Sequence, residues 1–494
     1  MTTTTTDRSP AVALDREILV LGAVVVLGTI MAILDATIVN VAIPTLAIDL
    51  HASISTIQWV MTAYLLAFAS VIPLTGWASE RFGAKRVWIA ALLTFMAGSV
   101  LAGIAWSAGS LIAFRAVQGF GGGAIMPVGQ TILARAAGPQ RMGRVMSVIG
   151  IPMLLAPIFG PVVGGAIVDG ASWRWIFFIN LPIGVLALLF AQRLLPEAKP
   201  QFGTSLDALG LALLSPGLAI FVYGMSTAGS SGGFGAGRTL AGVGTGLVLV
   251  ALFALHARRR GSQALLDLSL FAQRGFATAA ATTLLIGIAL FGALILLPLY
   301  FQLVRGTTPL QTGLLLVPQG LGAALAMPFA GRLTDTIGAR VVIPVGIVLA
   351  LVGAAAYTQV GADTSYVALA AALFVIGLGL GATIMPAMAV AYQSVSREAV
   401  ARATASLNMI QRIAASVGTA LLAVVLQRAL RAKLPDLDGG LAAVGAVAER
   451  RHAEVAPALA DAFGTAFWVA LGLIAVALIP ALLLPRRGEH VADG

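Results

Sequence analysis

The sequence predicts an all-α polytopic membrane protein, built as two six-helix bundles with two further helices inserted between them. Three observations support this prediction: the apolar content of the chain, the length of its apolar runs, and a motif that occurs twice. Of the 494 residues, 59% are hydrophobic and 10% are charged, and the mean hydropathy is +0.97. Soluble proteins carry about 25% charged residues, so this much apolar surface requires lipid as its solvent.

Fourteen apolar runs are each about long enough to cross a bilayer as a helix, which takes roughly 20 residues. The runs are continuously apolar and do not alternate, which indicates helices and not the strands of a membrane barrel. They lie at residues 18–43, 57–78, 88–106, 109–132, 145–168, 174–195, 207–226, 239–257, 276–300, 310–331, 341–360, 364–391, 403–427 and 463–485.

The basic residues predict the orientation of these spans. If the N-terminus lies inside, most of the 30 Lys and Arg residues fall in cytoplasmic segments, which is the positive-inside pattern. We therefore predict that both termini are cytoplasmic. The net charge of +10 then reflects topology and contact with membrane lipids, and we expect no nucleic-acid partner. The excess of Arg over Lys is typical of a GC-rich bacterial genome, so we expect a bacterial cytoplasmic membrane.

The composition also argues against enzyme chemistry. The chain has no cysteine, and its four histidines fall in loops or near chain ends, so we expect no thiol catalysis and no metal site. The glycine-rich stretches 119–123 and 229–237 lack the Gly-Lys-Ser/Thr ending of a phosphate-binding loop. We expect no cofactor and no use of ATP by this chain.

An internal repeat predicts two related halves. The stretch "GWASERFGAKR" (76–86) recurs as "GRLTDTIGARV" (331–341), and each copy follows the second span of a six-span block. Parallel repeats of this kind are typical of transporters. Glycines allow close helix approach, and charged groups there can contact neighbouring helix ends, although one copy alone could be an ordinary charged loop. We predict a gating or conformational role for Gly76, Glu80, Arg81, Gly83, Lys85, Gly331, Asp335, Gly338 and Arg340.

Polar segments set the predicted domain boundaries. We expect an N-terminal six-helix bundle at 1–200, a two-helix insert at 201–262, and a C-terminal six-helix bundle at 263–494. The Ala-rich, charged connection 428–462 receives no predicted function.

Four further motifs complete a family resemblance: "LDATIVNVAIP" (34–44), "FRAVQGFGGGAIMP" (114–127), "GPVVGG" (160–165) and "WRWIFFINLPIG" (173–184). With the repeated loop motif, they make the chain similar to the major facilitator superfamily, and specifically to the fourteen-span drug:proton antiporters of the EmrB/QacA type. The resemblance covers nearly the whole chain. It implies the major facilitator fold, alternating access, and export of small amphipathic drugs or antibiotics in exchange for protons. The loop motif departs from the family pattern at Glu80, where Asp is usual, and at Ala84, where a base is usual.

Asp35 is the central candidate residue. It lies well inside the first span, where an ionised carboxylate costs at least about 2.5 kcal/mol. A carboxylate that binds either a proton or a substrate exchanges one for the other, and the resemblance supports this role. Arg115, at a similar predicted depth in the fourth span, is its candidate partner for proton coupling. The alternatives are a structural acid and a static cavity charge.

Other polar residues within spans are candidates for a substrate cavity. Asn40, Gln118, Asn408 and Arg412 form this set, although Arg412 could equally fix helix packing. In the fifth span, Pro157 and Pro161 bend a helix, while Gly160 and Gly164 let helices approach closely. We predict a gating role for these four residues, with ordinary membrane packing as the alternative.

The main rival function is a proton-coupled uptake carrier for a small nutrient or metabolite. The fifth-span motif and the fourteen spans favour export. A membrane enzyme or a sensor is disfavoured, because the sequence offers no catalytic or metal-binding set of residues.

Overall fold

The computed structural model describes residues 16–138, 141–197, 205–230, 233–434 and 452–485, and these residues form helices without any strand. The helices are α1 (Arg16–Asp49), α2 (Ile54–Phe82), α3 (Ala84–Gly103), α4 (Ala108–Ala137), α5 (Met142–Gly170), α6 (Trp175–Phe178), α7 (Asn180–Leu194), α8 (Ala208–Ser230), α9 (Gly237–Arg260), α10 (Arg274–Leu299), α11 (Pro309–Ile337), α12 (Ala339–Tyr357), α13 (Tyr366–Gly381), α14 (Ile384–Gln393), α15 (Val400–Lys433), α17 (His452–Val476) and α18 (Leu478–Leu482). Short 3-10 segments, Gly261–Gln263 and Leu268–Ala272, precede α10, and a π-helical turn, Tyr300–Val304, follows it.

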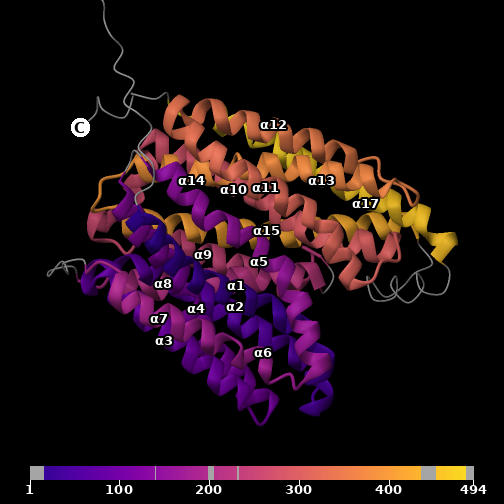
Figure 1. Ribbon diagram of the computed structural model, residues 1–494, viewed down its shortest axis with the longest axis horizontal. Coiled ribbons are helices and arrows are strands. Elements are labelled where there is room, and N and C mark those ends of the chain that lie inside the picture. The colour runs from indigo at the N-terminus through magenta and orange to yellow at the C-terminus, as the bar shows by residue number, and fades with distance from the viewer. Residues whose placement is uncertain (1–15, 139–140, 198–204, 231–232, 435–451, 486–494) are drawn as a thin grey trace, which may run out of the picture.

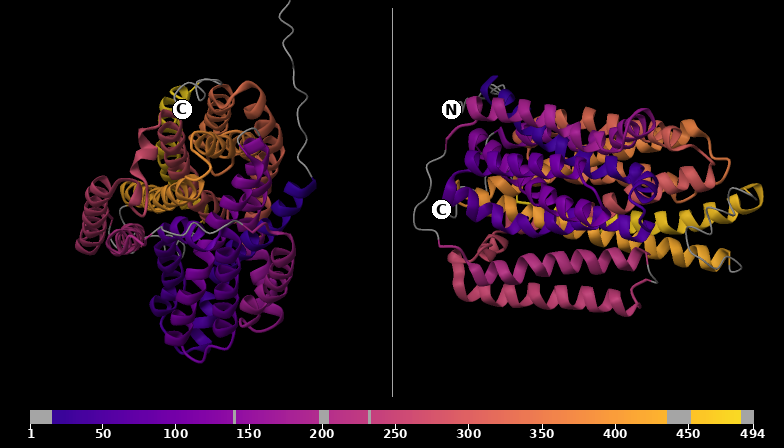
Figure 2. Two further views of the ribbon diagram at one scale, coloured as in Figure 1. Left: turned by 90° about the vertical axis from the view of Figure 1, so that its left-hand side faces the viewer. Right: turned by 90° about the horizontal axis from the view of Figure 1, so that it is seen from below.

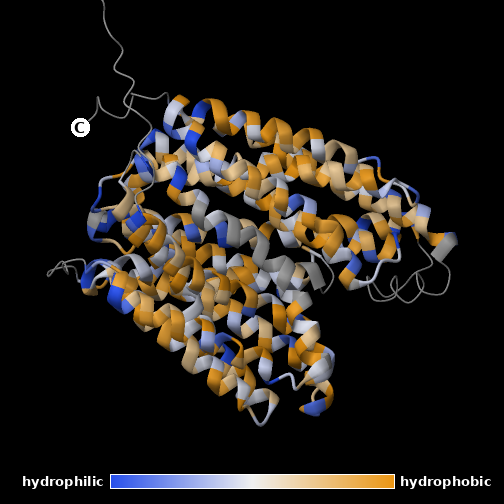
Figure 3. Ribbon diagram, in the orientation of Figure 1, coloured by the Kyte–Doolittle hydropathy of each residue, from blue (hydrophilic) through white to orange (hydrophobic). Residues whose placement is uncertain are grey.

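The helices are long and apolar enough to span a membrane. Within the described residues, 13 helical segments meet this requirement by length and composition. The 29-residue helix α5 lies between the fourth and fifth of these segments in the chain, which completes the fourteen predicted spans. The helices consist largely of hydrophobic residues, and hydrophilic residues gather at the helix ends (Figure 3). This distribution is that of a membrane-embedded protein.

The helices form two bundles and a separate hairpin. Helices α1–α7 make one bundle, which we call the N half, and α10–α18 make the other, the C half (Figure 1). Helices α8 and α9 form an antiparallel hairpin at the side, with α8 against α2 of the N half and α15 of the C half (Figure 2). The predicted domain boundaries at residues 200 and 262 stay predictions.

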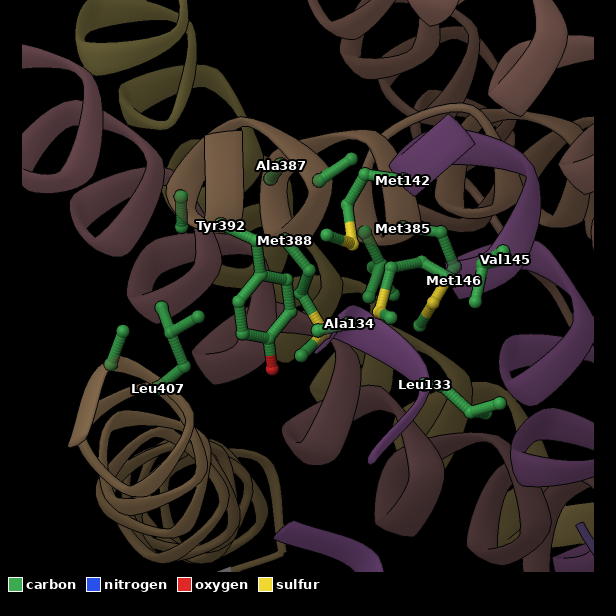
Figure 4. Packing of buried hydrophobic residues seen from close by; sticks show 14 of the residues in the cluster. Leu133, Ala134, Met142, Val145, Met146, Met385, Ala387, Met388, Tyr392 and Leu407 are labelled. Carbon is green, nitrogen blue, oxygen red and sulfur yellow. The ribbon is translucent and has the colours of Figure 1, made fainter. Parts of the chain in front are cut away.

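The two halves meet closely at one end and diverge toward the other (Figure 1). We call the first end, where α2 and α11 finish, the closed end, and the opposite one the splayed end. Apolar residues from both halves pack together near the closed end. Figure 4 shows Met142 and Met146 of α5 beside Met385 and Met388 of α14. Methionine is flexible and fills irregular gaps, so this contact between the halves is able to form and separate.

Several spans differ from their predicted form. The sixth has a local irregularity at Ile179, between α6 and α7, and the twelfth has one at Ala382 and Thr383, between α13 and α14, although φ and ψ remain in the helical region at these residues. Helix α15 continues to Lys433, and α17 begins at His452, so the connection predicted at 428–462 is shorter than expected. Its middle lies outside the described residues. Hydropathy alone does not locate such irregularities or helical extensions beyond the bilayer.

Candidate functional site

Asp35 and Arg115 form a fully buried ion pair. Asp35 of α1 and Arg115 of α4 are both 0% exposed, and Nη1 of Arg115 lies 2.5 Å from Oδ2 of Asp35. The expectation that these two residues lie at one depth and face each other is therefore met. The pairing compensates the charge that would otherwise be costly at this depth.

Two amides occupy the other carboxylate oxygen. Gln118 donates from Nε2 to Oδ1 of Asp35 at 2.9 Å, and Asn180 donates from Nδ2 to the same atom at 2.9 Å. Both amides also lie near Ser99 Oγ, at 3.1 and 3.0 Å, and this hydroxyl donates to the carbonyl of Phe177. Asp35 is thus held by donors from α4 and α7, and α3 supports those donors.

Local sequence explains how these side chains converge. A Cβ at Gly98 of α3 would lie 2.6 Å from the backbone of Gln118, so only glycine lets α3 approach α4 here. Asn180 is the first residue of α7, directly after Ile179, whose φ of −60° and ψ of −24° remain helical. Because α7 packs against α1, the Asn180 amide reaches Asp35.

Aromatic rings cover the Arg115 guanidinium. Its central carbon lies 4.1 Å from the ring centroid of Tyr64 and 5.7 Å from that of Phe177. Within the described part of the chain, its Nε and Nη2 atoms have no hydrogen-bond partner. Cation–π contact stabilises a charge of this kind, but it leaves part of the donor capacity of Arg115 unused.

The four predicted cavity residues do not form one cluster. We predicted that Gln118 lies on the surface of a cavity. In the structure it is fully buried and hydrogen-bonded to Asp35. Asn40 is exposed on α1, and five residues after Asp35 it faces another direction on the helix. Asn408 of α15 donates to Gln130 of α4 at 2.7 Å, which joins the two halves. Arg412 lies over the ring of Phe68, 3.9 Å from its centroid.

Glu80, in the first copy of the repeated motif, joins the halves at the closed end. It is 4% exposed, and its carboxylate accepts from Nε and Nη2 of Arg402 at 3.0 Å each. A Cβ at Gly76, one turn earlier on α2, would lie 3.3 Å from the backbone of α15. Glycine therefore brings the helices close enough for the ion pair.

Asp335, in the second copy, makes the equivalent contact from the C half. Its Oδ1 accepts from the backbone N–H of Gly143 at 3.2 Å, and its Oδ2 lies 3.4 Å from Nε of Arg144. Both partners belong to the first turn of α5, where a helix favours negative charge. A Cβ at Gly331 would lie 2.6 Å from the carbonyl of Gly143. Each half thus contributes one acid that contacts a base of the other half.

The remaining motif residues have local roles. Gly83 and Gly338 have φ of 87° and 93° between consecutive helices, a conformation that favours glycine. Lys85 donates to the carbonyl of Gln192 at 2.9 Å within the N half. Arg81 and Arg340 are partly exposed at the same end.

The predicted fifth-span motif lies in α5, against α1. A Cβ at Gly160 would overlap the hydroxyl oxygen of Thr37, and one at Gly164 would lie 3.1 Å from the carbonyl of Ile38. These glycines bring α5 close to α1 near Asp35. Pro157 and Pro161 also fall in α5, but their side chains lie outside the described residues.

An acid at the foot of the hairpin fixes its position. Asp207 is 1% exposed and accepts from Nε2 of His256 at 2.8 Å, from the N–H of Gly210 at 3.0 Å and from the N–H of Leu265 at 3.1 Å. Burial alone would raise the pKa of Asp207, but these hydrogen bonds outweigh it and hold the pKa below its ordinary value. Asp207 therefore ties α8 and α9 to the segment that leads into the C half.

Sequence reasoning missed Asn180, Ser99, Tyr64 and Arg402. Asn180 lies within the quoted stretch "WRWIFFINLPIG" but was not singled out. Like Asp35, Ser99 and Tyr64 are polar residues in apolar spans, which was the available signal. Nothing in the sequence paired Arg402 with Glu80.

Comparison with known proteins agrees with this geometry. Residues 25–419 match the sequence profile of the Major Facilitator Superfamily. The chain belongs to this superfamily. It is 39% identical over 492 residues to a Mycobacterium tuberculosis protein named multidrug resistance protein B homolog, a match that covers 96% of this chain and 91% of that one. It is 32% identical over 400 residues to the Escherichia coli multidrug export protein EmrB, covering 80% and 77% of the two chains.

Solved structures support the same fold. The chain superposes on a structure of the proton:xylose symporter XylE with a TM-score of 0.59 at 14% identity, covering 95% of this chain and 96% of that one. The predicted resemblance to EmrB-type members of the superfamily and the major facilitator fold are therefore confirmed. The chain is a membrane transporter for small substrates and not an enzyme.

Proposed function

We propose that this chain is a proton-coupled exporter of small amphipathic drugs or antibiotics, and that Asp35 is its proton-coupling residue. The observation that carries the proposal is the buried Asp35–Arg115 pair with its amide donors. Relatives named as multidrug resistance and export proteins support export. We further propose a bacterial cytoplasmic membrane with both termini cytoplasmic, and no cofactor or ATP.

The coupling follows from the contacts of the carboxylate. When ionised, Asp35 is held by Arg115, Gln118 and Asn180. A proton on Asp35 removes its negative charge, which weakens the ion pair and leaves the Arg115 charge uncompensated in the membrane interior. The N half then favours a different arrangement of α1 and α4. Proton uptake and a change of conformation are thereby linked.

The closed end supports a direction for this cycle. With the proposed topology the closed end is cytoplasmic, so this conformation opens outward. Glu80 with Arg402, and Asp335 with Arg144, hold the halves together at that end. In the proposed cycle, these contacts break when substrate loads from the inside, and they form again when the carrier opens outward. A proton then binds, and its re-entry contributes about 2.3 kcal/mol per 100 mV.

The test is proton-coupled transport in everted vesicles. A pH gradient is imposed, a panel of cationic dyes and neutral antibiotics is added, and the parent is compared with Asp35→Asn. We expect substrates to dissipate the gradient in the parent and not in Asp35→Asn. Asp49→Asn is the matched control, since Asp49 is the last residue of the same helix and accepts a hydrogen bond from Trp173.

Two results would argue against the proposal. Full coupling in Asp35→Asn would make Asp35 a structural residue. Uptake of a small nutrient in right-side-out vesicles, with no export of any compound, would favour the rival symporter function.

A further inference from the structure

Arg412 is a charge inside the membrane without an acidic partner. It lies on α15, about 12 residues from the start of that helix and thus roughly 18 Å along it. No carboxylate of the described residues forms an ion pair with it, and its guanidinium carbon lies 3.9 Å from the centroid of the Phe68 ring. A charged group at this depth requires a partner or a polar, hydrated space.

The buried acid Asp35 already has its partners. Asp35 has Arg115 on one oxygen and two amides on the other, and all of these groups are buried. The Asp35–Arg115 pair is neutral as a unit, so Arg412 leaves an excess of positive charge between the halves. Arg412 is also partly exposed, whereas Arg115 is not. Arg412 is therefore the accessible cation of the two.

The face of α15 that carries Arg412 looks toward the N half. Asn408, one turn nearer the closed end, bonds to Gln130 of α4 across the interface. Ser416 and Thr419 continue the same helical face toward the splayed end, and both are partly exposed. This polar face begins at the contact between the halves and extends toward the side on which the halves diverge.

Aromatic rings link Arg412 to the Asp35 pair. The Phe68 ring that contacts Arg412 lies 5.9 Å from the Tyr64 ring, and Tyr64 lies against Arg115. Tyr64 is fully buried and Phe68 is 7% exposed, so these rings position the two guanidinium groups. An amphipathic ligand with one negative group would match the partly exposed cation that remains.

We propose that Arg412 binds an anionic group of the substrate, so that this transporter recognises amphipathic compounds carrying one acidic group. The proposal rests on the proposed export function and adds its substrate class. An anion at Arg412 completes the charge balance between the halves. The Tyr64–Phe68 contact places that anion next to the pair that responds to protons.

The test uses two probes that differ in one group. 1-Anilinonaphthalene-8-sulfonate and N-phenyl-1-naphthylamine share their aromatic framework, and only the first carries a sulfonate. Binding to the full chain in phosphatidylcholine nanodiscs is measured by fluorescence titration, with empty nanodiscs subtracted. We expect the parent to bind the sulfonate about tenfold to hundredfold more tightly, as for a charge-assisted hydrogen bond.

Three variants assign that preference to Arg412. Arg412→Gln should bring the ratio of the two dissociation constants close to one, and Arg412→Lys should retain part of it. Arg431→Gln should keep the full preference, because Arg431 is exposed in the last turn of the same helix. Size-exclusion profiles and Tm values confirm that each variant is folded.

The results separate this proposal from the export function. No preference in the parent, an unchanged preference in Arg412→Gln, or an equal loss of both probes in that variant would overturn the anion site. Gradient-driven transport that depends on Asp35 would still support export in those cases. If the parent prefers the sulfonate probe through Arg412 but shows no gradient-driven transport, the anion site is supported and the export function is contradicted.

Discussion

Breaking the Glu80–Arg402 pair should open the closed end. Glu80→Gln removes the negative charge but keeps nearly the same side-chain shape. The Glu80 side chain is 3% exposed and that of Arg402 is 20% exposed, so the pair is intermediate between a surface and a buried ion pair. Its loss should cost about 1.5–3 kcal/mol. Every 1.4 kcal/mol is a factor of ten, so the open fraction should rise roughly tenfold to a hundredfold.

The absence of cysteine makes this shift directly measurable. The chain has no cysteine, so Ser147→Cys introduces a single thiol. Ser147 is 3% exposed and donates to the carbonyl of Met327 in the other half. A membrane-impermeant maleimide should reach it only when the halves separate at this end. While the open state is a minor population, the labelling rate in everted vesicles follows that population.

A matched variant shows whether the effect belongs to the pair between the halves. Lys85→Gln removes a charge at the same end but breaks a contact within the N half only. We expect its labelling rate to stay within about twofold of the parent. Equal labelling in the Glu80→Gln variant and the parent, or an equal rise in Lys85→Gln, would refute the assignment of Glu80 to the closed end.

Three further predictions concern single residues. Gly160→Ala should strongly reduce transport because its Cβ has no room against α1, whereas Gly165→Ala should be tolerated because nothing lies within 4 Å of that position; equal transport rates would contradict this. Asn180→Ala removes a donor to Asp35 and should slow proton-coupled exchange about tenfold or more, and an unchanged exchange rate would exclude Asn180 from the site. The folded-state pKa of Asp207 lies below its ordinary value, so its stabilising contribution is complete above about pH 5 and is lost only as pH falls through that lowered pKa. Asp207→Asn should therefore lower Tm throughout pH 5 to 8, and an unchanged Tm in this range would exclude Asp207 from the stability of the hairpin.

The sequence predicted best how deep a polar side chain lies within its membrane span. Asp35 and Arg115 could be placed at one level because a helix advances a fixed 1.5 Å per residue, and the structure brings the two side chains into contact. Their roles in proton coupling remain predictions. The loop repeat likewise predicted acids that contact neighbouring helix ends, and Asp335 does so at the first turn of α5.

Contacts between side chains of different helices could not be predicted in the same way. Asn180 reaches Asp35 because α7 packs against α1, and hydropathy carries no signal for which helices are neighbours. Arg402 meets Glu80 across 322 positions of sequence, and only the packing of the two halves decides this pairing. Gln118 was predicted to face a cavity because of its polarity, although polarity fits a buried amide bonded to Asp35 equally well.

The glycine-rich stretch 119–123 of α4 is not a phosphate-binding loop. It limits how the helices of the N half can move relative to one another. A Cβ at Gly119 or Gly123 would collide with the backbone of α2, and one at Gly121 would collide with the backbone of α3. These three helices therefore touch through main chain, without intervening side chains that could change rotamer and let one helix slide. Helices α2, α3 and α4 should therefore turn as one rigid body, and the amide protons of α4 should be among the slowest of the N half to exchange with solvent. A change in the position of α1 then occurs against this fixed unit, and flexible side chains lie instead in the methionine-lined contact between the halves.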